Sequence, residues 1–154
     1  GWGGLKASAD NNPDILVIDA APHDWLFPKL SLAVHHGGAG TTAATVRAGI
    51  PSVVIPFFGD QPFWAWRLEQ NGVAPKMLKR KTLTAEKLAD AINMASTPNM
   101  QIAATELAEK ISNENGVQSA IALLAQWGLL TPPDINDVPV LNDDAAYPKT
   151  ATTV

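Results

Sequence analysis

Two short apolar runs, residues 32–34 and 52–55, enclose a glycine-rich turn and an alanine-rich stretch, and this arrangement constrains the fold most. The alanine-rich stretch, residues 41–48, is followed by Gly49 and Pro51, and a glycine stop followed by proline marks the end of a helix. The order strand, turn, helix, strand predicts a parallel pair of strands joined by a right-handed crossover. We therefore predict an α/β fold, a Rossmann-like layered domain whose parallel sheet is flanked by helices.

Other elements are predicted by the same kinds of signal. The apolar run at residues 15–18 is typical of a strand covered on both faces. Capping residues and apolar periodicity predict helices over residues 61–71, 85–96, 99–113 and 117–127. Residues 1–128 are expected to form one domain that lacks a preceding strand, as in a part of a longer protein, and residues 129–154 an irregular tail.

The composition excludes several classes of function. The chain of 154 residues is 46% hydrophobic and 17% charged, which is typical of a soluble globular protein. A net charge of −4 provides no broad basic surface, so we expect no nucleic-acid partner. The absence of cysteine excludes thiolate chemistry and fits a cytoplasmic location. The Asp143-Asp144 pair has no accompanying ligand cluster, so no essential metal is predicted.

The chemistry is expected at the turn between residues 34 and 42, where a strand ends and a helix begins. The start of a helix offers unpaired N–H groups and positive dipole character to an anion. Glycines let a ligand approach the backbone, and Thr41 and Thr42 add hydroxyl donors, so a diphosphate is a plausible ligand. The turn is neither a P-loop nor a clean G-x-G-x-x-G fingerprint, and a purely structural tight turn is the alternative.

Three segments in the order His36–Thr41, Arg47–Pro51 and Pro56–Gln61, preceded by residues 22–28, resemble the donor-site signature of UDP-glycosyltransferases. The resemblance is strongest to the sterol glucosyltransferase-like branch and covers about residues 1–128. It implies a GT-B enzyme of two facing α/β domains, of which this chain contains the C-terminal, UDP-sugar-binding one.

The resemblance also implies roles for individual residues. Those matched to the diphosphate-binding turn are His36, Gly38, Ala39, Gly40 and Thr41. Those matched to sugar binding are Asp60 and Gln61, and those matched to nucleoside binding are Ala20, Ala21 and His23. Thr42 and Trp64 are further candidates, the latter because it follows the sugar-binding pair by one helical turn.

The chain differs from plant members of this family at three positions of the nucleoside site. Ala20 occupies the position where a tryptophan stacks on uracil, and His23 the position of a glutamine. Ala44 replaces a glutamate that holds the ribose hydroxyls. We therefore expect base recognition to rest on backbone groups and on His23.

Asp60 and His35 each have an alternative interpretation. Asp60 is also well placed to cap the helix that follows it. His35 is expected to point away from His36 if the strand persists, and it is either a packing residue or a residue that supports the site.

The implied reaction is inverting transfer of a hexose, expected to be glucose, from a UDP-sugar to an acceptor hydroxyl of a sterol or other lipid. No cofactor is expected, since helix N–H groups and His36 would stabilise the leaving diphosphate in place of a metal. No catalytic residue is assigned to this chain, because the family's general base lies in the N-terminal, acceptor-binding domain, its expected partner. The intact enzyme could lie peripherally at membranes. The alternatives are a separate donor-binding subunit that docks on a partner chain and a non-catalytic nucleotide-binding module.

Overall fold

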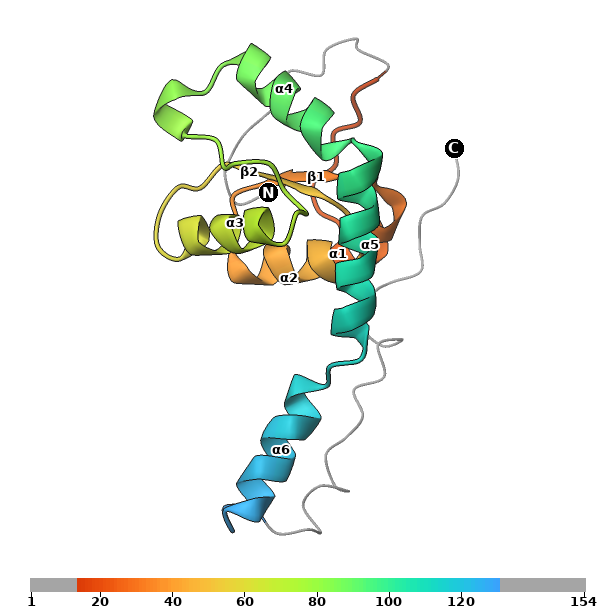
Figure 1. The fold of residues 1–154 in the computed structure, drawn as a ribbon, viewed down its shortest axis with the longest axis vertical. Coiled ribbons are helices and arrows are strands. Elements are labelled where there is room, and N and C mark those ends of the chain that lie inside the picture. Colours follow the sequence, from red (N-terminus) through yellow and green to blue (C-terminus); the bar gives the residue numbers. More distant parts are fainter. Residues whose placement is uncertain (1–13, 131–154) are drawn as a thin grey trace. The chain divides into compact units, whose positions relative to one another are not determined.

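The predicted strand–turn–helix–strand unit is present in the computed structural model, which describes residues 14–130. Strands β1 (Ala33–His35) and β2 (Ser52–Val54) pair in parallel, with Val34 opposite Val53. Helix α2 (Ala39–Arg47) connects them (Figure 1). The α/β fold class with a parallel sheet is therefore confirmed.

The remaining elements are mostly helical. Their bounds are α1 (His23–Leu26), η1 (Phe27–Lys29), α3 (Gln61–Gln70), η2 (Arg80–Thr82), α4 (Ala85–Ala95), α5 (Pro98–Ser112) and α6 (Gly116–Gln126). The predicted helices α3 to α6 are confirmed, with bounds that differ by no more than two residues, whereas α1, η1 and η2 were not predicted. Thr84 caps α4 as expected, because its hydroxyl accepts the N–H of Lys87 at 3.3 Å.

The chain divides into two compact units, Gly1–Glu114 and Asn115–Val154. Helix α6 belongs to the second unit, and the sheet and the other helices belong to the first. The domain boundary predicted at residue 128 stays a prediction. The loop predicted at the first residues and the irregular tail from residue 131, including the Asp143-Asp144 pair, lie outside the described residues.

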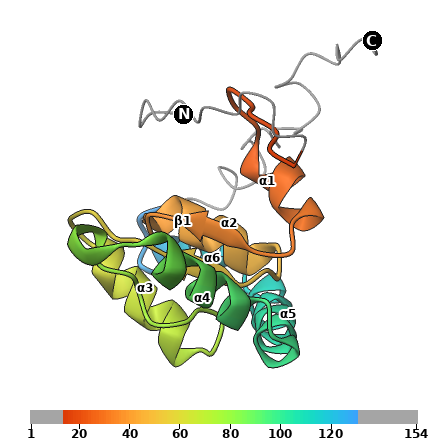
Figure 2. The same cartoon turned by 90° about the horizontal axis from the view of Figure 1, so that it is seen from above.

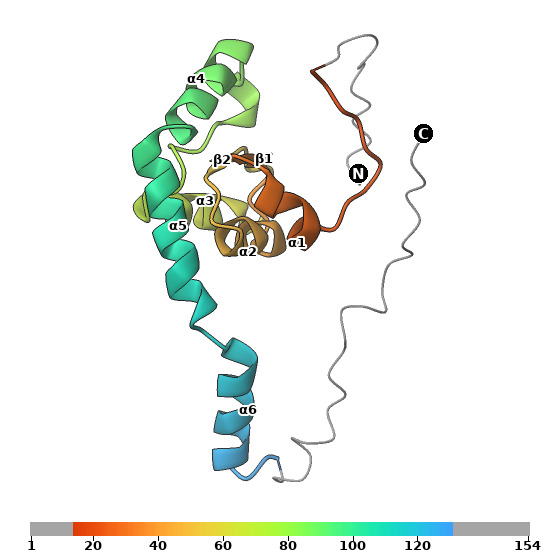
Figure 3. The ribbon, with the colours of Figure 1, turned by 90° about the vertical axis from the view of Figure 1, so that its right-hand side faces the viewer.

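Helices cover both faces of the small sheet (Figures 1 and 3). Alternate residues of β2 belong to different core clusters, one on each face. Val53, fully buried, packs with Ala91 and Ala95 of α4. Val54 packs on the other side, in a cluster that also includes residues of α2, α3 and α5. This alternation is the period of two that a strand imposes on its side chains.

A third cluster joins α1 and η1 to the strand–helix unit. Phe27, Ala33 and Ile50 are buried together, with Ala44 and Ala48 of α2 against them. Helix α1 therefore lies beside β1 and α2 (Figures 2 and 3).

The strand predicted at residues 15–18 is wrong. These residues have no strand assignment, and all four apolar side chains are exposed, Leu16 to 86%. A strand requires a hydrogen-bonded neighbour, and in the described part of the chain the sheet contains only β1 and β2. An apolar run predicts burial but does not itself supply the neighbouring strand.

Candidate functional site

The glycine-rich turn leads from β1 into a helix with no side-chain cap. Gly38 is at the N-cap position of α2, and within residues 14–130 no side-chain hydrogen bond caps the start of this helix. The N–H of Thr42 donates to the Gly38 carbonyl at 2.9 Å, and the N–H groups before it lack intrahelical acceptors. These N–H groups and the positive end of the helix dipole are suited to an anion.

Gly40 has open space around it in the first turn of α2. Apart from its chain neighbours and the backbone of its own helix, a Cβ atom built on this residue meets no atom of the described residues within 4 Å. Glycine within a helix costs about 0.5–1 kcal/mol relative to alanine, and no packing contact with the described residues requires it here. A ligand lying against the backbone would explain it.

Gly38 leaves room for the imidazole of His36. A Cβ atom at Gly38 would lie 2.5 Å from Nε2 of His36, closer than non-bonded atoms approach. The exposed His36 ring therefore lies over the backbone at the start of α2. Its Nε2 atom is next to the N–H groups that would hold an anion.

Gly37 brings the turn into contact with the beginning of α3. Its φ of +86° is in the left-handed region, and a Cβ there would lie 2.7 Å from Cγ1 of Val54 and 3.1 Å from the carbonyl oxygen of Gln61. Only glycine meets both requirements without strain. The predicted diphosphate and sugar residues, distant in sequence, are therefore brought together.

Gln61 is buried and holds the loop that follows β2 through hydrogen bonds to its backbone. Its Oε1 accepts the backbone N–H of Phe57 at 2.7 Å and that of Phe58 at 3.1 Å. This leaves the amide nitrogen Nε2 as the group that can donate to a sugar hydroxyl.

Asp60 is exposed, and its carboxylate does not cap α3 although the residue is at the N-cap position. Its Oδ2 instead accepts the indole N–H of Trp64 at 2.7 Å. The alternative interpretation of Asp60 as a helix cap is therefore wrong.

The His35 side chain supports the glycine turn through a hydrogen bond. Its Nδ1 accepts the N–H of Gly37 at 3.0 Å, whereas its Nε2 is buried without a hydrogen-bond partner among the described residues. Burial, followed by the charges of His36 and His23, lowers the pKa of His35 from its ordinary value of 6.5 to about 4. The ring is therefore neutral near pH 7, and of the two interpretations of His35 the structure favours support of the site.

The other candidate residues differ in accessibility. Thr41 is half-buried, whereas Thr42 is buried, and the Oγ1 of Thr42 has no partner in the described part of the chain. In the predicted nucleoside segment Ala20 and His23 are exposed and Ala21 is half-buried. The His23 ring stacks on Phe27, with 4.5 Å between ring centroids. The binding roles of these residues stay predictions.

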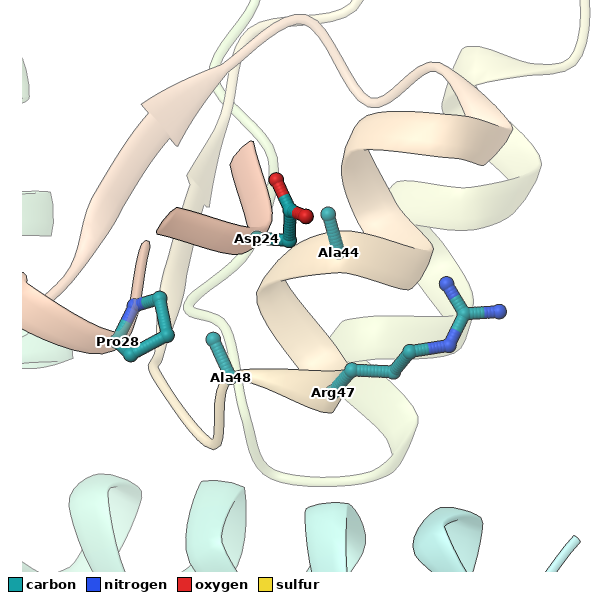
Figure 4. Close-up of a pocket in the computed structure, with 5 residues that line it drawn as sticks. All are labelled: Asp24, Pro28, Ala44, Arg47 and Ala48. Carbon is teal, nitrogen blue, oxygen red and sulfur yellow. The ribbon is translucent and has the colours of Figure 1, made fainter. Parts of the chain in front are cut away.

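A hollow of about 200 Å³ lies on the side of α2, lined by Asp24, Pro28, Ala44, Arg47 and Ala48. Figure 4 shows the Asp24 carboxylate turned toward α2, next to the methyl group of Ala44. The hollow is smaller than a typical ligand pocket of about 300–1,000 Å³ and does not include the glycine turn. Ala39 and Gly40, at the end of the turn, are exposed.

The described residues contain neither a metal-binding cluster nor a helix suited to span a membrane. Within residues 14–130, no group of three or more histidines and carboxylates could hold a metal ion. In the same part of the chain, no helix combines the length and the apolar character needed to cross a membrane.

Comparison with family models decides the identity of the domain. Residues 6–124 match the family described as erythromycin biosynthesis protein CIII-like, C-terminal domain. The chain belongs to this family. It therefore corresponds to the C-terminal domain of glycosyltransferases.

Curated relatives of this CIII-like domain include sterol glucosyltransferases. The chain is 43% identical over 121 residues to sterol 3-beta-glucosyltransferase UGT80A2 of Arabidopsis thaliana, covering 79% of this chain and 19% of the relative. It is 48% identical over 120 residues to the sterol 3-beta-glucosyltransferase of Saccharomyces cerevisiae (strain YJM789), covering 77% of this chain and 10% of that protein. The chain thus spans a tenth to a fifth of the length of these relatives.

Solved glycosyltransferases have the same fold as the CIII-like domain. The glycotransferase of kitacinnamycin matches with a TM-score of 0.70 and 25% identity, over 79% of this chain and 32% of that one. Glycosyltransferase VinC, solved in complex with DTDP, matches with a TM-score of 0.68 and 24% identity, over 75% of this chain and 29% of that one. The Rossmann-like GT-B architecture is therefore confirmed.

Proposed function

We propose that this domain binds the UDP-sugar donor of an inverting glycosyltransferase. The diphosphate would lie on the first turn of α2, and the sugar beside the start of α3. Gly37 supports this arrangement, because it brings the turn against the carbonyl of Gln61.

The open space over Gly40 carries the proposal. Gly116 at the start of α6 also has open space, but that helix is capped by the Asn115 side chain, whereas the start of α2 has no side-chain cap among the described residues. A diphosphate lying against this backbone would use the space that a side chain would otherwise occupy. The His36 side chain, which lies over Gly38, would then be next to the diphosphate.

The same groups would assist departure of UDP. As the bond from the anomeric carbon to the diphosphate breaks, negative charge increases on the phosphate oxygens. N–H donors held in place by α2, and a hydrogen bond from His36, would stabilise that charge more in the transition state than in the ground state. The acceptor hydroxyl must lose its proton to a base, which we expect in the acceptor-binding domain.

For the substrates, we propose glucose as the sugar and a sterol or similar lipid alcohol as the acceptor. The names of the curated relatives support both proposals. Asp60 and the Nε2 group of Gln61 would bind the sugar hydroxyls, one accepting and the other donating.

Calorimetric titration with UDP, UDP-glucose and dTDP tests the proposal. We expect saturable binding of UDP, weakened by about 1–3 kcal/mol in His36→Ala because a hydrogen bond to a charged group is lost. Comparison with dTDP measures how strictly the base and ribose are recognised. A folded chain that binds none of the three ligands would contradict the proposal and favour a structural turn, as would equal affinity in His36→Ala.

A further inference from the structure

The first turn of α3 does not need the Asp60 carboxylate as a cap. The N–H of Gln61 donates to the carbonyl of Phe58 at 3.4 Å, and Pro62 has no N–H. The N–H of Phe63 donates to the main-chain carbonyl of Asp60 at 3.0 Å. Because these donors are either absent or already paired, the carboxylate is available for another role.

Trp64 holds this carboxylate instead. Its indole N–H donates to Oδ2 of Asp60 at 2.7 Å, a charge-assisted hydrogen bond. The half-buried indole packs edge-on against Phe63, with 5.1 Å between ring centroids, which restricts its movement. The second carboxylate oxygen, Oδ1, remains available to a ligand.

We propose that Trp64 is a positioning residue that orients Asp60 toward the donor sugar. The inference rests on the proposed function and specifies how its sugar-binding part works. An exposed aspartate samples several rotamers in water, and a ligand that needs one of them must offset the cost of selecting it. The indole removes part of that cost before the sugar arrives.

Trp64→Phe tests this role, because it keeps an aromatic ring and removes the N–H donor. We expect UDP-glucose to bind about 5- to 10-fold more weakly to this variant, within the range for ordering one side chain on binding, while the affinity for UDP is unchanged. Trp66→Phe is the matched control, since Trp66 is an exposed tryptophan of the same helix and it should change neither affinity.

A second measurement separates positioning from packing. In the proton–nitrogen spectrum of the unmodified chain, the indole N–H resonance of Trp64 should move on Asp60→Asn substitution and on addition of UDP-glucose, and much less with UDP. In an Asp60→Ala background, Trp64→Phe should have no further effect on UDP-glucose affinity, because the two residues act through one contact.

The outcomes distinguish this inference from the proposed function. If UDP binds but Trp64→Phe keeps the full affinity for UDP-glucose, or if the sugar adds no affinity in the unmodified chain, the positioning role is overturned and the diphosphate site stands. If UDP itself does not bind, the proposed function fails and the inference fails with it.

Discussion

The consecutive histidines before the glycine turn occupy opposite environments. His35 is the last residue of β1, and its ring is largely buried beneath the turn, whereas His36 is exposed above it. Alternation of side chains along a strand separates them in this way. The result is a neutral imidazole that supports the turn and an accessible one beside the helix start.

The buried histidine makes stability depend on pH. The pKa of His35 is about 4 in the folded chain against an ordinary value of 6.5, so between these values the unfolded chain binds more protons. The free energy of unfolding should therefore decrease as pH falls through this window, with a contribution from His35 of at most about 3 kcal/mol. His35→Asn, whose Oδ1 can accept the N–H of Gly37, should lack this contribution. Urea denaturation near pH 7 and near pH 4 measures it, and identical pH dependence in the two chains would exclude it.

Substitution of Gly40 should affect the free energy of unfolding and the affinity for UDP differently. Gly40→Ala is expected to leave the free energy of unfolding unchanged or to raise it by up to about 1 kcal/mol, because alanine is the better helix former and its Cβ has room. The same methyl group should weaken UDP binding about tenfold or more by occupying the space of the ligand. Gly116→Ala in α6, also without neighbours around the added Cβ, is the matched control and should leave UDP affinity unchanged. Undiminished UDP binding in Gly40→Ala would refute the proposed ligand position.

At the scale of elements, the site depends on how the turn after β1 and the loop after β2 meet. Gly37 contacts the start of α3, and Gln61 holds the loop before it through Phe57 and Phe58. A buried hydrogen bond joins α2 to the start of β2, because the hydroxyl of Ser52 donates to Oγ1 of Thr45 at 3.2 Å. The two loops are therefore fixed by the same small group of elements.

Gln61 is expected to have a structural role as well as any role in binding. Gln61→Met preserves length but removes the acceptor for two backbone N–H groups, and should reduce the free energy of unfolding by about 1–3 kcal/mol. Gln61→Glu keeps an acceptor at the same position but loses the Nε2 donor for the sugar, and its buried carboxylate adds a desolvation cost of its own. Urea denaturation of Gln61→Met measures the structural role. Full stability of this variant would show that the loop hydrogen bonds are unimportant.

Elements with strong local signals could be predicted from the sequence. Helix α4 is an example, because Thr84 caps it and Leu88, Ala91 and Ala95 repeat at helical spacing. Contacts made at long range could not be predicted in this way. The apolar residues 15–18 resemble a buried strand but are exposed, because the outcome depends on a neighbouring strand that local sequence does not specify. Asp60 is a different case, since Trp64 is only four residues away and the local sequence allows both a helix cap and this pairing.

At the scale of the whole molecule, we expect this domain to bind the donor and a separate domain to bind the acceptor. The chain spans 19% of the Arabidopsis relative and 10% of the yeast one, and the acceptor-binding domain is expected elsewhere. We therefore expect this chain alone, given UDP-glucose and a sterol, to bind the donor and form little or no sterol glucoside in a chromatographic assay. Turnover by this chain alone would show that it supplies its own base.

The most direct test of the diphosphate site is a titration with UDP followed by the backbone N–H resonances of the chain. We predict that the resonances of Ala39, Gly40 and Thr41 shift first and most, because their N–H groups begin α2 without a cap. Those of Gln118 and its neighbours in α6 should remain in place. Shifts confined to residues around the hollow at Asp24 and Ala44, with residues 39–41 unmoved, would contradict the placement of the diphosphate on the glycine turn.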